Sequence, residues 1–340
     1  MIKRGLYLIK LCLLCLPHLS VGQGTFDRSQ SHIHPEWNDA ATIGIQPQPI
    51  AGLAYRQYVN QTGVGLSTYE AGFSMPLNIN YNAENDNSGF FLSSPELQNK
   101  IKTNRDARRK HGLGINLRSL QYDIYQINEV QISYAFHLPL SKAYNLSIGT
   151  SFNYGVSSIN AENLTVRDPF NDMFYQGIIN ANSATVRKLS SNIGLAFYSK
   201  DLLISANFKN IILFEQGNLQ SAATSYKKMI QPHFFVSYKW DFGQKIYLSP
   251  NFIYNYSLLY GNTFSGNLRV NYNSSLYLGI GLQNNSRISG LLGIKLTRDI
   301  FMNYSYDFNN NYGELATNGV HELSINYLFK NKRARTPFLW

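Results

Sequence analysis

Long stretches of this chain alternate between apolar and small polar residues, and this pattern constrains the fold more than any other feature. In NLSIGTSFNYGVS, residues 145–157, an apolar side chain stands at nearly every second position, with Asn, Ser and Gly between them. A period of two indicates a β-strand with one apolar face. Many such stretches run to about ten or twelve residues, whereas strands of soluble sheets average roughly five or six. That length crosses a hydrocarbon layer at a tilt of about 45°.

The polar face of these stretches is unusual because it carries Asn, Ser, Gly and Gln but few charged residues. Charged residues make up only 15% of the chain and aromatic residues 14%, and this composition suits a wet lumen better than an open solvent face. Unpaired backbone groups are not tolerated in lipid, so such strands must close on themselves. The sequence therefore predicts an all-β fold, an antiparallel transmembrane β-barrel of the outer membrane.

The alternation predicts about fourteen strands, an even number as expected for such a barrel. The predicted strands are 50–59, 66–77, 112–121, 128–138, 145–158, 188–199, 202–213, 228–241, 245–258, 263–272, 275–284, 287–296, 300–308 and 320–329.

The connections alternate in length as well. Short turns such as Lys200-Asp201 and Asn273-Ser274 join even strands to odd ones, whereas the opposite connections, such as 159–187, are mostly longer. Outer-membrane barrels have short periplasmic turns and long extracellular loops, which assigns the two ends. One connection breaks the rule: residues 78–111 fall on the short-turn side, and we interpret them as a periplasmic insertion, with a miscount of strands near the N-terminus as the alternative.

Pro232 and Pro250 stand inside neighbouring predicted strands. Each removes one donor from the ladder of backbone hydrogen bonds, and a closed barrel has no free edge at which to place it. We expect a bulge or a kink at these positions.

The first 22 residues are predicted to be a secretory signal peptide. Lys3, Arg4 and Lys10 precede or interrupt a short apolar run, and small residues stand before Gln23. Both cysteines, Cys12 and Cys15, lie in this segment, so cysteine chemistry is not expected after export. Residues 23–49 are predicted to form a periplasmic or lumenal N-terminal segment, residues 50–329 the barrel, and residues 330–340 a basic tail.

The formal net charge is +10, and the positive charge gathers in the basic tail and in the insertion. For an exported protein, such runs indicate contact with partner proteins or acidic lipid rather than with nucleic acid. We therefore expect contact with outer-membrane lipid, and we take the basic residues of the insertion as candidate partner contacts: Lys100, Lys102, Arg105, Arg108, Arg109 and Lys110.

No catalytic or metal-binding pattern stands out. His321 and Glu322 are adjacent on a predicted strand, so their side chains point to opposite faces, His321 to lipid and Glu322 to the lumen. His32 and His34, with Glu36 nearby, supply only half of a zinc site, and we interpret this stretch as part of a mobile N-terminal segment. We expect no catalytic residue, no metal, no cofactor and no enzymatic activity.

The C-terminal strand pair carries a recognisable pattern of Tyr-Asp, a polar loop, Gly, His-Glu and a final Tyr-x-Phe. On these residues, and on Tyr55-Arg56 and the Gly112-Leu113-Gly114 strand start, the chain resembles the PorP/SprF family of outer-membrane proteins of the Bacteroidota type IX secretion system. The resemblance assigns family-motif, structural positions to Tyr306, Asp307, Gly319, His321, Glu322, Tyr327 and Phe329.

The sequence also departs from the family pattern. Its N-terminal segment reads NDAATIG, residues 38–44, without the proline and tyrosine of the family pattern. This puts in doubt any role that the segment has in other members, as a lumenal plug or a docking site.

The resemblance implies a non-enzymatic role, in which the barrel works with type IX secretion components. It would assist secretion or surface attachment of specific cargo, such as adhesins with C-terminal sorting domains, and in some members it would support gliding. The architecture alone leaves an alternative open, a passive or substrate-specific outer-membrane pore.

Overall fold

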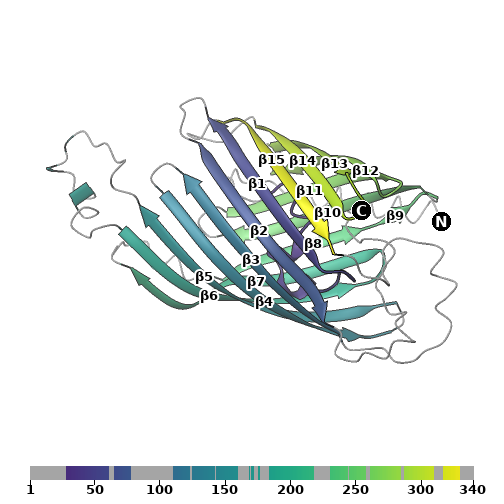
Figure 1. Cartoon of the computed structure of the whole chain (residues 1–340). Helices are drawn as coiled ribbons and strands as arrows, with labels where there is room; N and C mark the ends of the chain where they lie inside the picture. Colours follow the sequence, from purple (N-terminus) through teal and green to yellow (C-terminus); the bar gives the residue numbers. More distant parts are fainter. Residues whose placement is uncertain are drawn as a thin grey trace.

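The predicted strands form one antiparallel sheet (Figure 1). A computed structural model describes residues 28–60, 65–77, 110–122, 125–141, 143–159, 168, 170–171, 175–176, 184–217, 230–243, 245–257, 261–284, 287–309 and 317–329. Its strands are β1 (Ile50–Asn60), β2 (Leu66–Leu77), β3 (Lys110–Tyr122), β4 (Tyr125–Pro139), β5 (Asn145–Ile159), β6 (Ala184–Tyr198), β7 (Leu202–Gly217), β8 (Gln231–Tyr238), β9 (Trp240–Asp241), β10 (Ile246–Ser257), β11 (Gly261–Tyr272), β12 (Leu276–Gln283), β13 (Arg287–Lys295), β14 (Ile300–Asn309) and β15 (Thr317–Leu328).

The sheet closes into a barrel. β15 pairs with β1, and β10 pairs with β11, so every strand except the two-residue β9 pairs with neighbours on both sides. β8 and the two-residue β9 both pair with β10 and together occupy one place in the wall. The barrel therefore has fourteen strand positions, as the sequence predicted. No helix within the described residues is long and apolar enough to cross a membrane.

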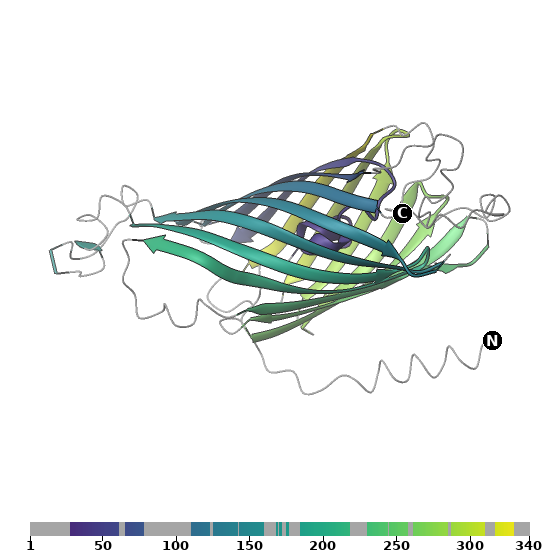
Figure 2. The same cartoon turned by 90° about the horizontal axis from the view of Figure 1, so that it is seen from below.

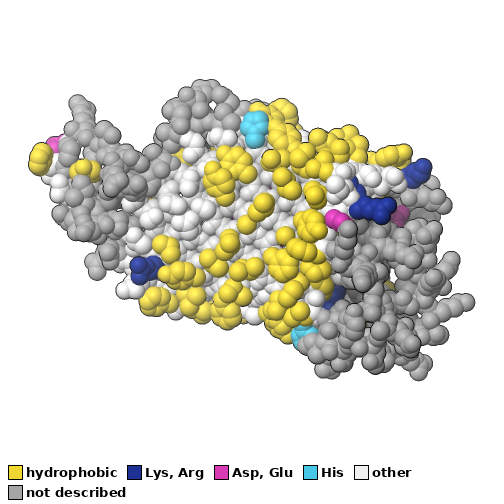
Figure 3. Space-filling view, viewed as in Figure 1, with side chains coloured by type: hydrophobic (Ala, Val, Ile, Leu, Met, Phe, Trp, Pro, Cys, Tyr) yellow, Lys and Arg dark blue, Asp and Glu magenta, His cyan; other side chains and the backbone are white. Residues whose placement is uncertain are grey.

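The wall has an apolar exterior and a polar interior, as the alternation requires. Leu53, Ile132 and Ile280 are each about 60% exposed on the outside. On β14 and β15, lumenal residues such as Asn303, Asp307 and Glu322 are almost fully buried and alternate with exposed apolar side chains of the same two strands. On the face of the wall that Figure 3 shows, hydrophobic side chains are spread over the surface and the visible charged side chains lie near its two ends.

The connections lie at the two ends of the barrel as predicted. β11 and β12 are joined by Asn273 and Ser274, which both have positive φ, the geometry of a type I′ hairpin turn. We call this end the short-turn end. β2 and β3 meet here too, but most of the predicted insertion, residues 78–109, lies outside the described residues. Lys110 and His111, which we had assigned to the insertion, belong to β3 instead, where His111 pairs with Leu77.

Pro250 interrupts the wall. Asn251 of β10 pairs with Ser237 of β8, and Leu248 pairs with Trp240 of β9, which leaves Pro250 without a partner on that side. No extra residue is inserted in either strand, so the predicted irregularity is a gap in pairing rather than a bulge. Pro232 pairs with β7 in regular register and stands just outside the paired segment of β10.

The N-terminal segment lies inside the barrel. Residues 28–49, which we call the plug, include two short 3-10 helices, η1 (Pro35–Trp37) and η2 (Ala40–Thr42). Figure 2 shows this segment as a dark purple coil enclosed by the strands. Plug residues such as Ala41 and Ile43 are almost fully buried. The core of this barrel is therefore the interface between the wall and its own N-terminus.

Candidate functional site in the lumen

The plug is a compact structure held by local hydrogen bonds. Asp39 caps η2, since its Oδ1 accepts a hydrogen bond from the Ala41 amide at 2.9 Å, and the Thr42 hydroxyl donates to the Asp39 carbonyl at 2.8 Å. The His34 and Trp37 rings stack with centroids 4.2 Å apart. Burial raises the pKa of Asp39 to about 6. The turns of the plug therefore satisfy some of the polar groups that it buries.

The wall makes room for the plug with glycines on its lumenal face. A Cβ atom at Gly149 would lie 2.5 Å from the Ala41 Cα, closer than real Cβ contacts come. Equivalent overlaps with plug atoms would arise at four other lumenal glycines, on β1, β2, β3 and β6: Gly52, Gly72, Gly112 and Gly194. The glycine that opens β3 in the family pattern, Gly112, is one of them. The fit of the plug is therefore built into the sequence of the wall.

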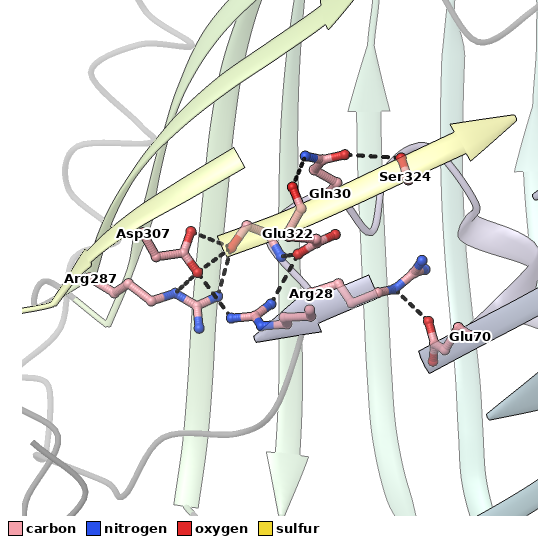
Figure 4. Close-up of polar contacts among 9 residues, drawn as sticks. Arg28, Gln30, Glu70, Arg287, Asp307, Glu322 and Ser324 are labelled. Atoms are coloured by element: carbon pink, nitrogen blue, oxygen red, sulfur yellow. Dashed lines mark hydrogen bonds and ion pairs between the residues drawn. The ribbon is translucent and has the colours of Figure 1, made fainter. Parts of the chain in front are cut away.

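A cluster of buried charges ties the start of the plug to the C-terminal strands (Figure 4). We call Arg56, Arg287, Asp307 and Glu322 the charge cluster. Arg56 lies 3.0 Å from Asp307 and 3.1 Å from Glu322, and Arg287 lies 3.4 Å from Asp307. Asp307 is 0% and Glu322 1% exposed, so their charges need these partners, because an unpaired buried charge is costly.

Ser29 connects the plug to both acids of the charge cluster. Its hydroxyl donates to Asp307 at 2.7 Å, and its amide donates to Glu322 at 2.9 Å. Beside it, Arg28 forms an ion pair with Glu70 at 3.0 Å and lies over the Trp37 ring. These contacts hold the first residues of the plug against β2, β14 and β15.

The other half of the plug is fixed to the opposite wall. His137 donates from Nε2 to the Ile43 carbonyl at 2.7 Å, and the Tyr198 hydroxyl bonds the other ring nitrogen of His137 at 2.7 Å. The Asn207 amide donates to the Asn38 carbonyl at 2.6 Å. η2 accordingly contacts β4, β5, β6 and β7.

The family-motif positions divide between the two faces of the wall. Asp307 and Glu322 face the lumen in the charge cluster. His321 faces outward, where its Nδ1 lies 2.8 Å from the Tyr304 hydroxyl and its ring lies 4.9 Å from Tyr306. The prediction that the His-Glu pair is split across the wall agrees with this geometry.

The remaining motif positions are explained by packing. Gly319 has a φ of +143°, and a Cβ there would lie 2.6 Å from the Tyr306 ring, so the glycine and the tyrosine fit each other. Tyr327 and Phe329 form an edge-on pair on the exterior at the short-turn end, 4.8 Å apart. Such rings suit the boundary between lipid and water.

The structure corrects one expectation for the N-terminal segment. His32 and His34 are buried in the lumen, 6% and 1% exposed, rather than on a mobile segment. They also contact different parts of the wall, because His34 bonds Glu36 and Asn326 whereas His32 lies by Asn267. Within the part of the chain that the structure describes, no group of three His, Cys, Asp or Glu residues could hold a metal.

Most of the candidate partner contacts lie outside the described residues. Of the six basic residues in question, only Lys110 is described. Its ammonium group donates to the Ile45 carbonyl at 3.3 Å, so it holds the end of the plug. A role for Lys110 in partner contact would compete with this bond.

Sequence reasoning missed the role of Arg56, although a signal for it was present. Closure of the barrel places Arg56 directly opposite Glu322 in the register of β1 and β15. The alternation assigned Glu322 to the lumenal face, but no face was assigned to Arg56 from the sequence. Two opposite charges that share a buried face are expected to pair.

A closed barrel with an apolar exterior band and a polar, plugged lumen is an outer-membrane β-barrel. A family model described as type IX secretion system membrane protein PorP/SprF matches residues 92–327. The chain therefore belongs to the PorP/SprF family, and the resemblance found in the sequence is confirmed. No curated protein matches the chain.

Several solved outer-membrane barrels have a similar architecture at low identity. The toluene transporter TbuX of Ralstonia pickettii is 9% identical, with 91% of this chain and 97% of that chain covered, at a TM-score of 0.48. Omp33 of Acinetobacter baumannii is 10% identical, with coverage of 84% and 100% and a TM-score of 0.44. A FadL homologue of Pseudomonas aeruginosa is 11% identical, with coverage of 90% and 96% and a TM-score of 0.44.

Proposed function

We propose that this barrel is a non-enzymatic part of the type IX secretion system that assists the secretion or surface attachment of specific cargo, such as adhesins with C-terminal sorting domains. The observation that carries the proposal is the family match over residues 92–327. A role in gliding belongs to the same proposal, as one outcome of attaching an adhesin to the surface.

The lumen supports a scaffold rather than a pore. Hydrogen bonds join the plug to both sides of the wall, through Ser29 at one end and Ile43 at the other. A channel for small solutes needs a continuous aqueous path, whereas these contacts fill the lumen with the chain itself. The plugged lumen therefore favours action through the surfaces at the ends of the barrel.

Deletion of the gene tests the proposed role. We expect one surface adhesin to disappear from the cell surface while uptake of small solutes stays intact, and the wild-type gene should restore the adhesin. An unchanged secretome and cell surface in the deletion strain would refute the proposal.

Planar bilayers separate the scaffold from the pore. The intact barrel should give no large steady conductance, whereas a variant that lacks residues 28–49 should conduct and so show that an open pore would have been detected. Stable currents through the intact protein would favour the alternative function of a pore.

The basic run of the insertion can be tested separately. Replacement of residues 78–109 by a two-residue Asn-Gly turn leaves β2 and β3 whole, since β3 begins at Lys110. We expect the variant to lose secretion partners in a pull-down from membranes. An unaltered set of partners would show that this run is not a docking site.

A further inference from the structure

Arg269, on the lumenal face of β11, differs from the other arginines in the lumen. Each of the others lies within 3.4 Å of a carboxylate: Arg28, Arg56, Arg118 and Arg287. Arg269 is only 6% exposed, and its Nε has no hydrogen-bond partner among the described residues. The guanidinium group makes one described cation–π contact, with the Tyr277 ring, whose centroid lies 5.4 Å from the guanidinium carbon.

The surroundings of Arg269 are neutral. Among the described residues, the ionisable side chains that interact electrostatically with Arg269 are Tyr247, Tyr277 and His32, and none of these is a carboxylate. The facing residue on β12 is Gly279, where a Cβ would lie 2.8 Å from the Arg269 Cγ. The described part of the wall therefore accommodates the stem of the arginine but supplies no counter-ion.

A second donor from the plug lies beside the same tyrosine. The His32 ring packs edge-on near Tyr277, with centroids 6.1 Å apart. The side-chain amide of Asn251 donates from Nδ2 to Asn267 Oδ1 at 2.7 Å. This leaves Nδ2 of Asn267 to donate to His32 Nδ1 at 3.4 Å. The proton of His32 is then on Nε2, which is buried and has no described partner. Burial and the nearby Arg269 charge lower the pKa of His32 well below its usual value, so the ring is neutral.

These groups present donors without acceptors. A buried guanidinium without a counter-ion is costly, and its planar fork of N–H groups matches the oxygens of carboxylate and phosphate. We propose that Arg269 and His32 form a binding site for a small free oxyanion, a phosphate or a carboxylate, which ties the plug to β11. This site does not depend on the proposed role in secretion.

Phosphate titration of the exported chain in phospholipid-free micelles tests the site. Ionic strength is held constant with chloride, and thermal unfolding is followed by circular dichroism. The midpoint should rise with phosphate and reach a plateau, because a ligand that binds only the folded state stabilises it by mass action. Equilibrium dialysis with labelled phosphate should show one ion per barrel, and acetate should compete for it.

Matched variants decide the outcome. Arg269→Gln should abolish the saturable effect of phosphate, whereas Arg298→Gln, which removes the same charge from an exposed turn, should retain it. If Arg269→Gln does not fold, His32→Phe replaces it and should weaken phosphate binding by about tenfold or more, the loss expected for one hydrogen bond to a charged group. Absence of saturable binding to the wild type would overturn the proposal and identify Arg269 as a merely hydrated side chain. Unchanged binding in Arg269→Gln or, if that variant does not fold, in His32→Phe would overturn it as well.

Discussion

The fit between wall and plug makes Gly149→Ala the sharpest perturbation of this structure. The added Cβ would lie 2.5 Å from the Ala41 Cα and would also meet the Ala40 and Ala41 backbone. Carbon atoms at their best separation are about 3.5–4.0 Å apart, so the plug must retreat by about 1 Å. The atoms that the added Cβ would overlap belong to the plug backbone, which cannot move aside as the tip of a side chain could. Overpacking of this kind costs about 1–3 kcal/mol.

That strain should loosen the plug by a measurable factor. If the plug opens in equilibrium with its bound state, about 1–3 kcal/mol corresponds to roughly a 5- to 150-fold larger open population. The predicted exported chain has no cysteine, so Gln46→Cys, at a plug position that is 7% exposed, gives a single label site. The rate of maleimide labelling in micelles should rise by the same factor in Gly149→Ala.

Gly155→Ala is the matched control for this experiment. Gly155 lies on the same strand and the same face, but a Cβ there would meet only the Asn128 carbonyl, at 3.9 Å. Its labelling rate should equal that of the parent. Equal rates in the parent and in Gly149→Ala would refute the idea that the wall glycines fit the plug. Equal acceleration in both variants would show that the effect comes from β5 and not from the plug.

The other predictions concern charge, backbone and pH. Arg56→Gln should destabilise the barrel by about 3–5 kcal/mol in urea unfolding, because it leaves buried acids short of a partner, whereas the exposed Arg298→Gln should change stability by less than about 0.5 kcal/mol. Gly319→Ala should cost about 1–3 kcal/mol, whereas Gly290→Ala, where nothing lies within 4 Å of an added Cβ, should cost far less; equal costs would contradict the explanation. The raised pKa of Asp39, about 6, favours the folded state below about pH 4, and this contribution is lost as the pH rises through 6. The stability of the wild type relative to Asp39→Asn should therefore fall between pH 4 and pH 7, by up to about 3 kcal/mol.

The wall was predictable because each strand has one face in contact with lipid and the other face in the lumen. Lipid on one side and the lumen on the other impose the period of two along nearly the whole length of each strand, and the predicted 66–77 matches β2 residue for residue. Where a proline interrupts the pairing, the prediction was less accurate. The predicted strand 228–241 is divided at Lys239 into β8 and β9, next to the gap in pairing at Pro250.

The plug was not predictable from its own pattern. Its turns have no period, and its buried polar residues resemble an exposed loop when they are considered alone. The sequence did contain a signal in the wall, where the lumenal Gly149 stands among Asn and Ser. Glycines on a lumenal face indicate that another segment fills the space where side chains would lie, but the sequence does not identify that segment. The missing family proline and tyrosine do not prevent the segment 38–44 from forming η2.

The way the plug is held bears on how such a barrel could serve secretion. The charge cluster uses acids of the C-terminal strands, Asp307 and Glu322, to bind both a strand partner, Arg56, and the plug residue Ser29. The same two acids therefore stabilise the closure of the barrel between β15 and β1 and hold the plug in the lumen. Withdrawing the plug would remove hydrogen bonds from the acids at that seam, so the plug and barrel closure support each other. If the proposed function holds, cargo is recognised at the ends of the barrel, and the lumen contributes the rigidity on which that recognition depends.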